Sequence, residues 1–324
     1  MTIAHRRGRA AAGTVVALMT LAACSATAAS PGGRTEGAAE EPGTVTVEHA
    51  QGATEIPADP QRVVVFDMGT LDTLDALGLG EEVVGVPKAS VPSFLSEYES
   101  ADLADVGTLQ EPDHEALARL DPDLVLVGFR SAAAYPELSK AFPTVDVTYE
   151  FTEGLAGAER SAALVGEIFG KEAEVEELVA QLDAQVEEIR PAGEAAGTGM
   201  VLQTSGGEVT LNGAASRYGP IFTDLGVAEA RTGVAAAQHG EVVSFELIRD
   251  ANPDWIFAVD RDAAIGQPSG QAAEQVLDNE LVAATTAWQT GQVVYLDGER
   301  WYVVMHGLNN IQAMLDEIGK ALAS

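Results

Sequence analysis

Residues 113–130 read Asp113-His-Glu-Ala-Leu-Ala-Arg-Leu-Asp-Pro-Asp-Leu-Val-Leu-Val-Gly-Phe-Arg130, and residues 244–261 read Ser244-Phe-Glu-Leu-Ile-Arg-Asp-Ala-Asn-Pro-Asp-Trp-Ile-Phe-Ala-Val-Asp-Arg261. In each stretch a glutamate opens a short helical run, an Asp/Asn-Pro-Asp turn follows, and an apolar strand leads to an arginine. This repeat predicts two similar α/β lobes. It also predicts an arginine in each lobe at the carboxyl end of a strand, where open α/β sheets bind their ligands.

The rest of the chain alternates apolar strands with helices, which is typical of a parallel sheet covered by helices. The longest helical stretch runs from Leu155 to Ile189, with a break at Phe169-Gly170-Lys171, and we expect Pro191-Ala-Gly193 to end it. A helix of this length can join two lobes as a rigid spar. The predicted fold class is therefore α/β, with two Rossmann-like lobes and parallel-rich sheets joined by one long α-helix. The predicted boundaries are 44–152 for the N-terminal lobe, 153–190 for the helical segment and 191–324 for the C-terminal lobe.

The N-terminus carries the pattern of a targeting segment rather than of a folded domain. Three arginines precede a short apolar core, which ends in Leu21-Ala-Ala-Cys24. This motif resembles the lipobox of bacterial lipoproteins, so we expect residues 1–23 to be a signal peptide and Cys24 to carry lipid. An ordinary secretory signal with a nearby cysteine is the alternative. Residues 24–43 are rich in Ala, Ser, Thr, Gly, Pro and Glu, which predicts a flexible tether.

Composition argues against several classes of function. The chain has 18 basic and 50 acidic residues, a formal net charge of −32, which argues against nucleic acid and anionic lipid surfaces as partners. Its single cysteine allows neither an internal disulfide nor a cysteine-based metal site. The sequence contains no Gly-x-Ser-x-Gly and no His-Glu-x-x-His motif, and we therefore expect a binding protein without an intrinsic cofactor rather than a secreted enzyme.

Further motifs are spread over the whole chain after Val45. They are Val63-Val-Val-Phe-Asp-Met-Gly-Thr-Leu-Asp-Thr-Leu-Asp-Ala-Leu-Gly78, Val106-Gly-Thr-Leu-Gln-Glu-Pro-Asp113, Ser216-Arg-Tyr-Gly219, Gln238-His-Gly240, Asp260-Arg-Asp-Ala-Ala-Ile-Gly266 and Glu299-Arg-Trp-Tyr302. Taken together, these segments resemble the siderophore-binding lipoproteins of iron ABC importers, of the catecholate or petrobactin type.

The resemblance implies a class III periplasmic-binding-protein fold with the ligand between two lobes. In the catecholate group three arginines line the cleft, and they match Arg130, Arg217 and Arg261. His239 and Tyr302 match side chains that reach ferric iron when the siderophore leaves coordination sites open. The resemblance also implies a lipid-anchored monomer on the outer side of the cell membrane, which delivers a ferric siderophore to an ABC permease. The acidic residues that engage the permease, one per lobe, match Glu115 and Glu246.

One segment departs from the family pattern, in which small residues and glycines usually follow the Trp-Tyr pair. Here Val303-Val-Met-His-Gly307 follows, and His306 could add a second imidazole to the site or face away from it.

Other interpretations remain open at this point. Each arginine could form a surface ion pair, His239 could be an exposed loop residue and Tyr302 a core aromatic. The two glutamates could be helix-start residues favoured by the dipole. Haem or cobalamin is the main alternative ligand on the same fold. Zinc or manganese binding needs more converging histidines and carboxylates than this chain offers.

Overall fold

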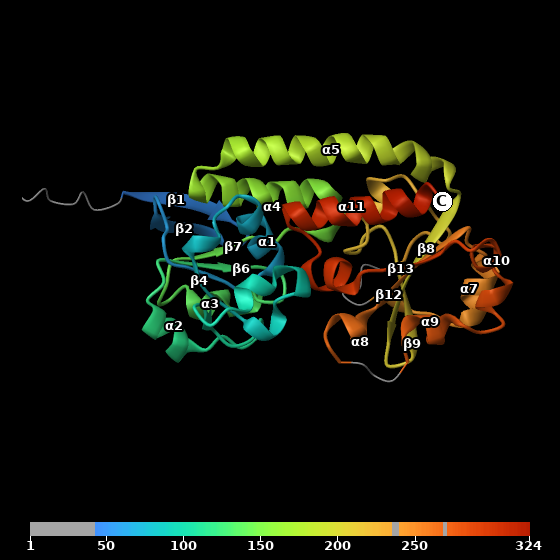
Figure 1. The fold of residues 1–324 in the computed structure, drawn as a ribbon, viewed down its shortest axis with the longest axis horizontal. Helices are drawn as coiled ribbons and strands as arrows, with labels where there is room; N and C mark the ends of the chain where they lie inside the picture. The colour runs from blue at the N-terminus through green and yellow to red at the C-terminus, as the bar shows by residue number, and fades with distance from the viewer. Residues whose placement is uncertain (1–42, 235–239, 268–270) are drawn as a thin grey trace, which may run out of the picture. The chain divides into compact units, whose positions relative to one another are not determined.

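The computed structural model describes residues 43–234, 240–267 and 271–324. Two separate sheets carry most of the strands, and one long helix, α5 (Glu172–Ala195), passes alongside both (Figure 1). Among the described residues, no helix is long and apolar enough to cross a membrane.

The N-terminal sheet is five-stranded and wholly parallel, in the order β5-β4-β3-β6-β7. Its strands β3, β6 and β7 are buried along their whole length, as expected for parallel strands covered on both faces. An antiparallel hairpin, β1–β2, precedes the sheet. The elements of this lobe are β1 (Thr44–His49), β2 (Gly52–Pro57), β3 (Val63–Val65), α1 (Met68–Ala76), β4 (Val83–Val86), β5 (Ala104–Asp105), α2 (His114–Leu120), β6 (Leu124–Val127), α3 (Tyr135–Leu138) and β7 (Thr144–Asp146).

Two consecutive helices follow this sheet. Helix α4 (Gly154–Phe169) ends at Gly170, whose φ of 61° gives the left-handed turn that separates it from α5, as the sequence predicted. The prediction that Pro191-Ala-Gly193 ends α5 is wrong, since the helix continues through these residues to Ala195. A proline removes only one helical hydrogen bond, and Gly193 packs directly against the backbone carbonyl of Leu225, which holds the last turn in place.

The C-terminal sheet is mixed. Its order is β11-β9-β8-β12-β13, with β10 also paired to β8, and β9 and β11 run antiparallel to their neighbours. The helix predicted from Tyr218 to Gly226 is shorter than expected, because it spans only α6 (Pro220–Thr223). The remaining elements are β8 (Thr198–Ser205), β9 (Glu208–Asn212), β10 (Ala228–Glu229), β11 (Glu241–Val242), α7 (Phe245–Ala251), β12 (Trp255–Asp260), α8 (Arg261–Ala264), α9 (Ala273–Leu277), α10 (Thr286–Thr290) and β13 (Val293–Leu296).

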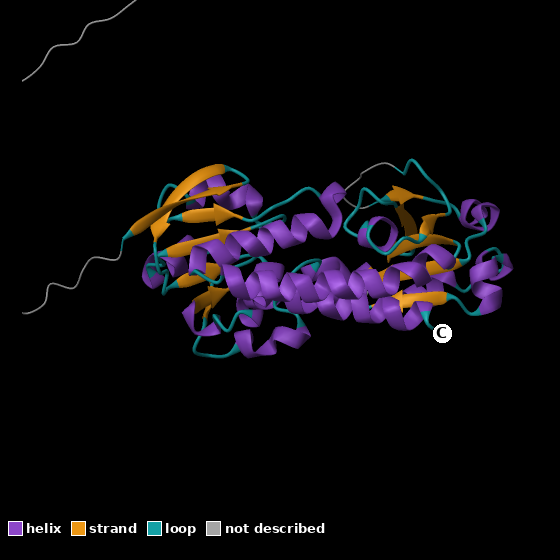
Figure 2. Ribbon diagram, turned by 90° about the horizontal axis from the view of Figure 1, so that it is seen from above, coloured by secondary structure: helices purple, strands orange, loops and turns teal. Residues whose placement is uncertain are grey.

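After β13 the chain returns to the N-terminal lobe. Residues 297–307, which we call the crossing segment, include one π-helical turn (Glu299–Val304), and π-turns are often found at functional sites. They lead into the last helix, α11 (Leu308–Leu322), which packs on α5 and on α1 of the N-terminal lobe. Seen from above, long helices run between the two groups of strands (Figure 2). The crossing segment therefore contacts both lobes, and Tyr302 lies within it.

Candidate functional site

The two repeat units fold alike up to their strands. Asp113 caps α2 and Ser244 caps α7, each through a side-chain oxygen that accepts from a backbone amide of the first turn. Both helices end on a left-handed residue before the proline, Asp121 at φ 48° and Asn252 at φ 44°. Strands β6 and β12 follow, so the predicted helix–turn–strand unit is present in both lobes.

The arginines that follow these strands meet at Tyr302, together with Arg217. Arg130 donates to the backbone carbonyls of Tyr302 at 2.5 Å and Val303 at 2.9 Å. Arg217 donates to the same Tyr302 carbonyl at 3.2 Å, and Arg261 Nε donates to the Tyr302 hydroxyl at 2.9 Å. The three guanidinium carbons lie 5.0, 4.7 and 5.6 Å from the centre of the Tyr302 ring, within cation–π range.

This cluster concentrates positive charge in a strongly acidic protein. Burial, with Arg130 and Arg261 as like charges, lowers the pKa of Arg217, which is only 8 % exposed. The hydrogen bond to Tyr302 raises the pKa of Arg261, against the opposing effect of burial. Asp262 lies 3.3 Å from Arg261, whereas Arg130 donates to neutral carbonyls and forms no ion pair within residues 43–234, 240–267 and 271–324. The group therefore suits an anionic ligand with paired oxygens.

Aromatic side chains of the N-terminal lobe adjoin the arginines, and sequence reasoning missed them. The ring of Phe151 stacks on that of Phe129, with centroids 5.4 Å apart and planes 11° apart, and Arg217 lies 5.4 Å from the centre of the Phe151 ring. Tyr149 meets Phe129 edge-on at 5.1 Å. The only available signal was the position of Phe129 immediately before Arg130.

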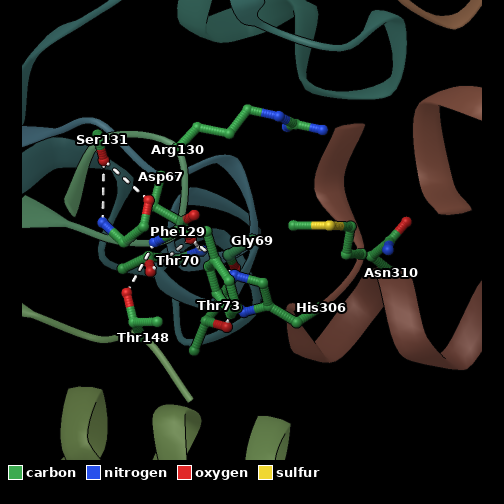
Figure 3. A network of polar contacts seen from close by, with 12 residues as sticks. Asp67, Gly69, Thr70, Thr73, Phe129, Arg130, Ser131, Thr148, His306 and Asn310 are labelled. Atoms are coloured by element: carbon green, nitrogen blue, oxygen red, sulfur yellow. Dashed lines mark hydrogen bonds and ion pairs between the residues drawn. The ribbon is translucent and has the colours of Figure 1, made fainter. Parts of the chain in front are cut away.

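His306 packs against the N-terminal lobe. It is 2 % exposed, and its Nε2 lies 2.8 Å from Asp67 Oδ1 in an ion pair when the ring is protonated (Figure 3). Its ring covers Gly69, where a Cβ atom would come within 2.5 Å of it. Burial alone would raise the pKa of Asp67, but His306 and the bonds from Thr70 outweigh it and lower that pKa.

The other predicted site residues fall into two groups. Cys24 and His239 lie outside the described residues. Glu115 and Glu246 are exposed and occupy the first turns of α2 and α7, in matching positions of the two lobes. In the part of the chain that the structure describes, no group of three or more His, Cys, Asp or Glu side chains is arranged to hold a metal ion.

Comparison with known proteins identifies the family. The family model for periplasmic binding proteins matches residues 63–299. The petrobactin-binding protein YclQ of Bacillus subtilis is 37% identical over 281 residues, which cover 86% of this chain and 88% of YclQ. The ferric-anguibactin-binding protein FatB of Vibrio anguillarum is 35% identical, with 86% of this chain and 88% of FatB covered.

Solved structures agree with this assignment. The crystal structure of YclQ covers 87% of this chain and 99% of its own, with a TM-score of 0.84 and 36% identity. That of the periplasmic catecholate-siderophore binding protein VctP from Vibrio cholerae covers 85% and 99%, with a TM-score of 0.79 and 35% identity. The predicted two-lobed fold is confirmed, and the relatives are named as binding proteins rather than enzymes. The chain belongs to the periplasmic binding protein family.

Proposed function

We propose that this protein captures a ferric siderophore between its lobes, with a preference for catecholates, and delivers it to the permease of an ABC iron importer. The observation that carries the proposal is the convergence of Arg130, Arg217 and Arg261 on Tyr302. Relatives that match most of the chain are named for petrobactin, anguibactin and catecholate siderophores, which supports the same ligand class.

The chemistry of the arginines favours such a ligand. Ferric catecholate complexes are anionic and present pairs of planar oxygens, which the guanidinium fork matches. Arg130 is bonded to neutral carbonyls, so exchange of these for charged oxygens would strengthen its hydrogen bonds. The ligand is cargo, and the proposal includes no resident cofactor and no catalytic step.

Contact with the metal itself is a finer part of the proposal. A tetradentate siderophore leaves two of the six iron positions open, and phenolate and imidazole are both suitable ferric ligands. We assign these positions to Tyr302 and His239. Tyr302 is 3% exposed and its hydroxyl accepts from Arg261, so to bind iron as a phenolate it would release the hydroxyl proton while still accepting from Arg261.

The remaining assignments concern the cell surface. We propose a lipid anchor at Cys24, a monomer facing outward from the cell membrane, and docking to the permease through Glu115 and Glu246. Relatives described as lipoproteins support the anchor, and the exposure of both glutamates at matching positions supports the docking.

A fluorescence titration tests the proposal against haem and cobalamin. Trp301 precedes Tyr302, so a ligand among the arginines should quench tryptophan emission. We expect saturable quenching by a ferric bis-catecholate, and neither saturable quenching nor a shifted absorption band with haem or cobalamin. Saturation by haem or cobalamin in place of the ferric chelate would contradict the proposed function.

A further inference from the structure

The backbone at Phe129 adopts a conformation that side chains rarely take. Its φ is 48°, in the left-handed region, although the residue is not glycine. The turn is held by hydrogen bonds on both sides: Phe129 N–H donates to Thr148 at 2.7 Å, and Gly128 N–H donates to the Ser131 hydroxyl at 2.9 Å (Figure 3). Strained residues held in this way cluster at ligand-binding positions.

The turn places Phe129 beside the candidate site. Its ring lies between the ring of Phe151 at 5.4 Å and that of His306 at 5.0 Å. Arg217 lies 5.4 Å from the centre of the Phe151 ring and 4.7 Å from that of Tyr302, so the aromatic side chains adjoin the guanidinium groups. Phe129 also immediately precedes Arg130, just beyond the end of β6 at Val127.

The cluster differs from an ordinary core in its exposure. Phe129, Tyr149 and Phe151 are only half-buried, whereas His306 behind them is 2 % exposed and fixed by Asp67. A partly exposed apolar patch next to converging cations suits a ligand with an aromatic body and an anionic edge.

We propose that Phe129 and Phe151 form an aryl subsite, which selects ferric siderophores whose iron-binding oxygens are carried on aromatic rings. The inference rests on the proposed function and adds the residues that set its specificity. In this arrangement the iron-bound oxygens face the arginines, and the ring carbons pack against the phenylalanines. Tyr149 and His306 are positioning residues that support Phe129 from behind. A ferric chelate of aliphatic carboxylates has no aromatic rings to pack against the phenylalanines, so it interacts only with the charged arginines.

The test compares two anionic chelates, a ferric bis-catecholate and ferric citrate, by tryptophan quenching. The variants are Phe129→Leu and Phe151→Leu, which keep an apolar side chain and, at position 129, the same left-handed backbone. Phe142→Leu is the matched control, since Phe142 is half-buried in a different cluster of the same lobe. Each site variant should weaken catecholate binding about 3- to 10-fold, the usual value of one aromatic contact. Ferric citrate affinity should stay within about twofold, since charge alone supports it.

Each possible result of this test either supports or overturns the aryl subsite. Equal weakening of both chelates, or unchanged catecholate affinity in both variants, would overturn the aryl subsite while leaving the proposed function standing. Failure of the wild type to bind any ferric chelate would overturn both. Thermal unfolding of each variant checks the fold, and if Phe129→Leu does not fold, Phe151→Leu on the separate 149–151 loop decides the question alone.

Discussion

The N-terminal unit ending at Arg130 and the C-terminal unit ending at Arg261 are the same up to their strands and differ after them. Both have a capped seven-residue helix, a left-handed residue before the proline and a buried strand. Beyond the strand, Arg130 follows the strained Phe129 and donates to backbone carbonyls, whereas Arg261 begins α8 and donates to the Tyr302 hydroxyl.

The difference shows where local and long-range forces act. Caps and turns depend on residues within a few positions, so similar sequences give similar geometry. Both arginines share one partner segment, the crossing segment, which lies more than 40 positions away from Arg261 and more than 170 from Arg130. The two lobes thus hold one segment from opposite sides by different contacts.

The largest expected effect comes from removing either repeat-equivalent arginine. A hydrogen bond to a charged group contributes roughly 1.5–3 kcal/mol, so Arg130→Ala and Arg261→Ala should each weaken ferric catecholate binding about 10- to 100-fold. Quenching titrations measure this directly, with Arg119→Ala, on the exposed face of α2, as control. Unchanged affinity in either variant would break the equivalence of the two units at the ligand.

The N-terminal lobe also contacts the start of α11 through Asp72, whose carboxylate accepts a hydrogen bond from the backbone amide of Asn310 at 2.9 Å. Burial raises the pKa of Asp72 from 3.8 to about 6, since it disfavours the charged form more than its hydrogen bonds favour it. The folded state therefore binds an extra proton between these pH values, and stability falls as pH rises from about 4 through about 6.

Asp72→Asn should remove this loss of stability at high pH, because the amide does not ionise. Its side-chain oxygen can still accept the hydrogen bond from the backbone amide of Asn310. We expect the variant to be more stable than the wild type by roughly 2–3 kcal/mol at pH 8, and the difference to vanish below pH 4. Urea unfolding at both pH values measures it. A variant less stable at pH 8 would mean that the ionised carboxylate stabilises the helix start more than burial opposes it.

Much of this architecture could be predicted from the chain alone. Apolar runs and turn residues predicted the parallel strands and the break at Gly170, and the repeat placed Arg130 and Arg261 at strand ends. Arg217 entered only through the family resemblance, because it follows a loop with no periodic pattern. The continuation of α5 beyond Pro191 depends on Gly193 packing against Leu225, which no local pattern reveals.

The aromatic and ionic contacts of the crossing segment could not be predicted from the sequence either. His306 meets Asp67 and Asn310 meets Asp72 across more than 230 positions, and such pairs form only when α11 packs on α1. The left-handed φ of Phe129 also contradicts the usual preference of phenylalanine, so sequence rules would place it in the strand. The contacts that sequence reasoning missed are thus long-range ones, both at the crossing segment and at the end of α5.

The left-handed residues that end α2 and α7, Asp121 and Asn252, allow a further comparison of the two units, with a smaller expected effect. Asp121 is exposed, so Asp121→Gly should stabilise the protein by about 0.5–1 kcal/mol through relief of the backbone strain. Asn252 additionally accepts from Thr286 N–H at 2.8 Å, so Asn252→Gly loses a hydrogen bond and should give no gain. Thermal midpoints measure both variants, and an equal gain at both positions would show that the Thr286 contact contributes nothing.

The smallest expected effect on affinity concerns the exposed glutamates. Glu115→Lys and Glu246→Lys should leave ferric catecholate affinity unchanged, because both side chains are exposed in the first turns of α2 and α7 and belong to neither the arginine nor the aromatic cluster. Iron uptake by cells carrying either variant should fall, since a permease arginine would meet a like charge. The exposed Glu187→Lys on α5 is the control. Normal uptake with both charges reversed together would remove the docking assignment.

Arg217 tests the central claim most directly, because it lies outside the repeat yet contacts both Tyr302 and Phe151. The measurement is the dissociation constant for a ferric bis-catecholate of the wild type and of Arg217→Met, which keeps a long apolar side chain. We expect saturable binding by the wild type and a loss of about 10- to 100-fold in the variant. Equal affinity of the two proteins would contradict the account of an anionic iron chelate held by three converging arginines.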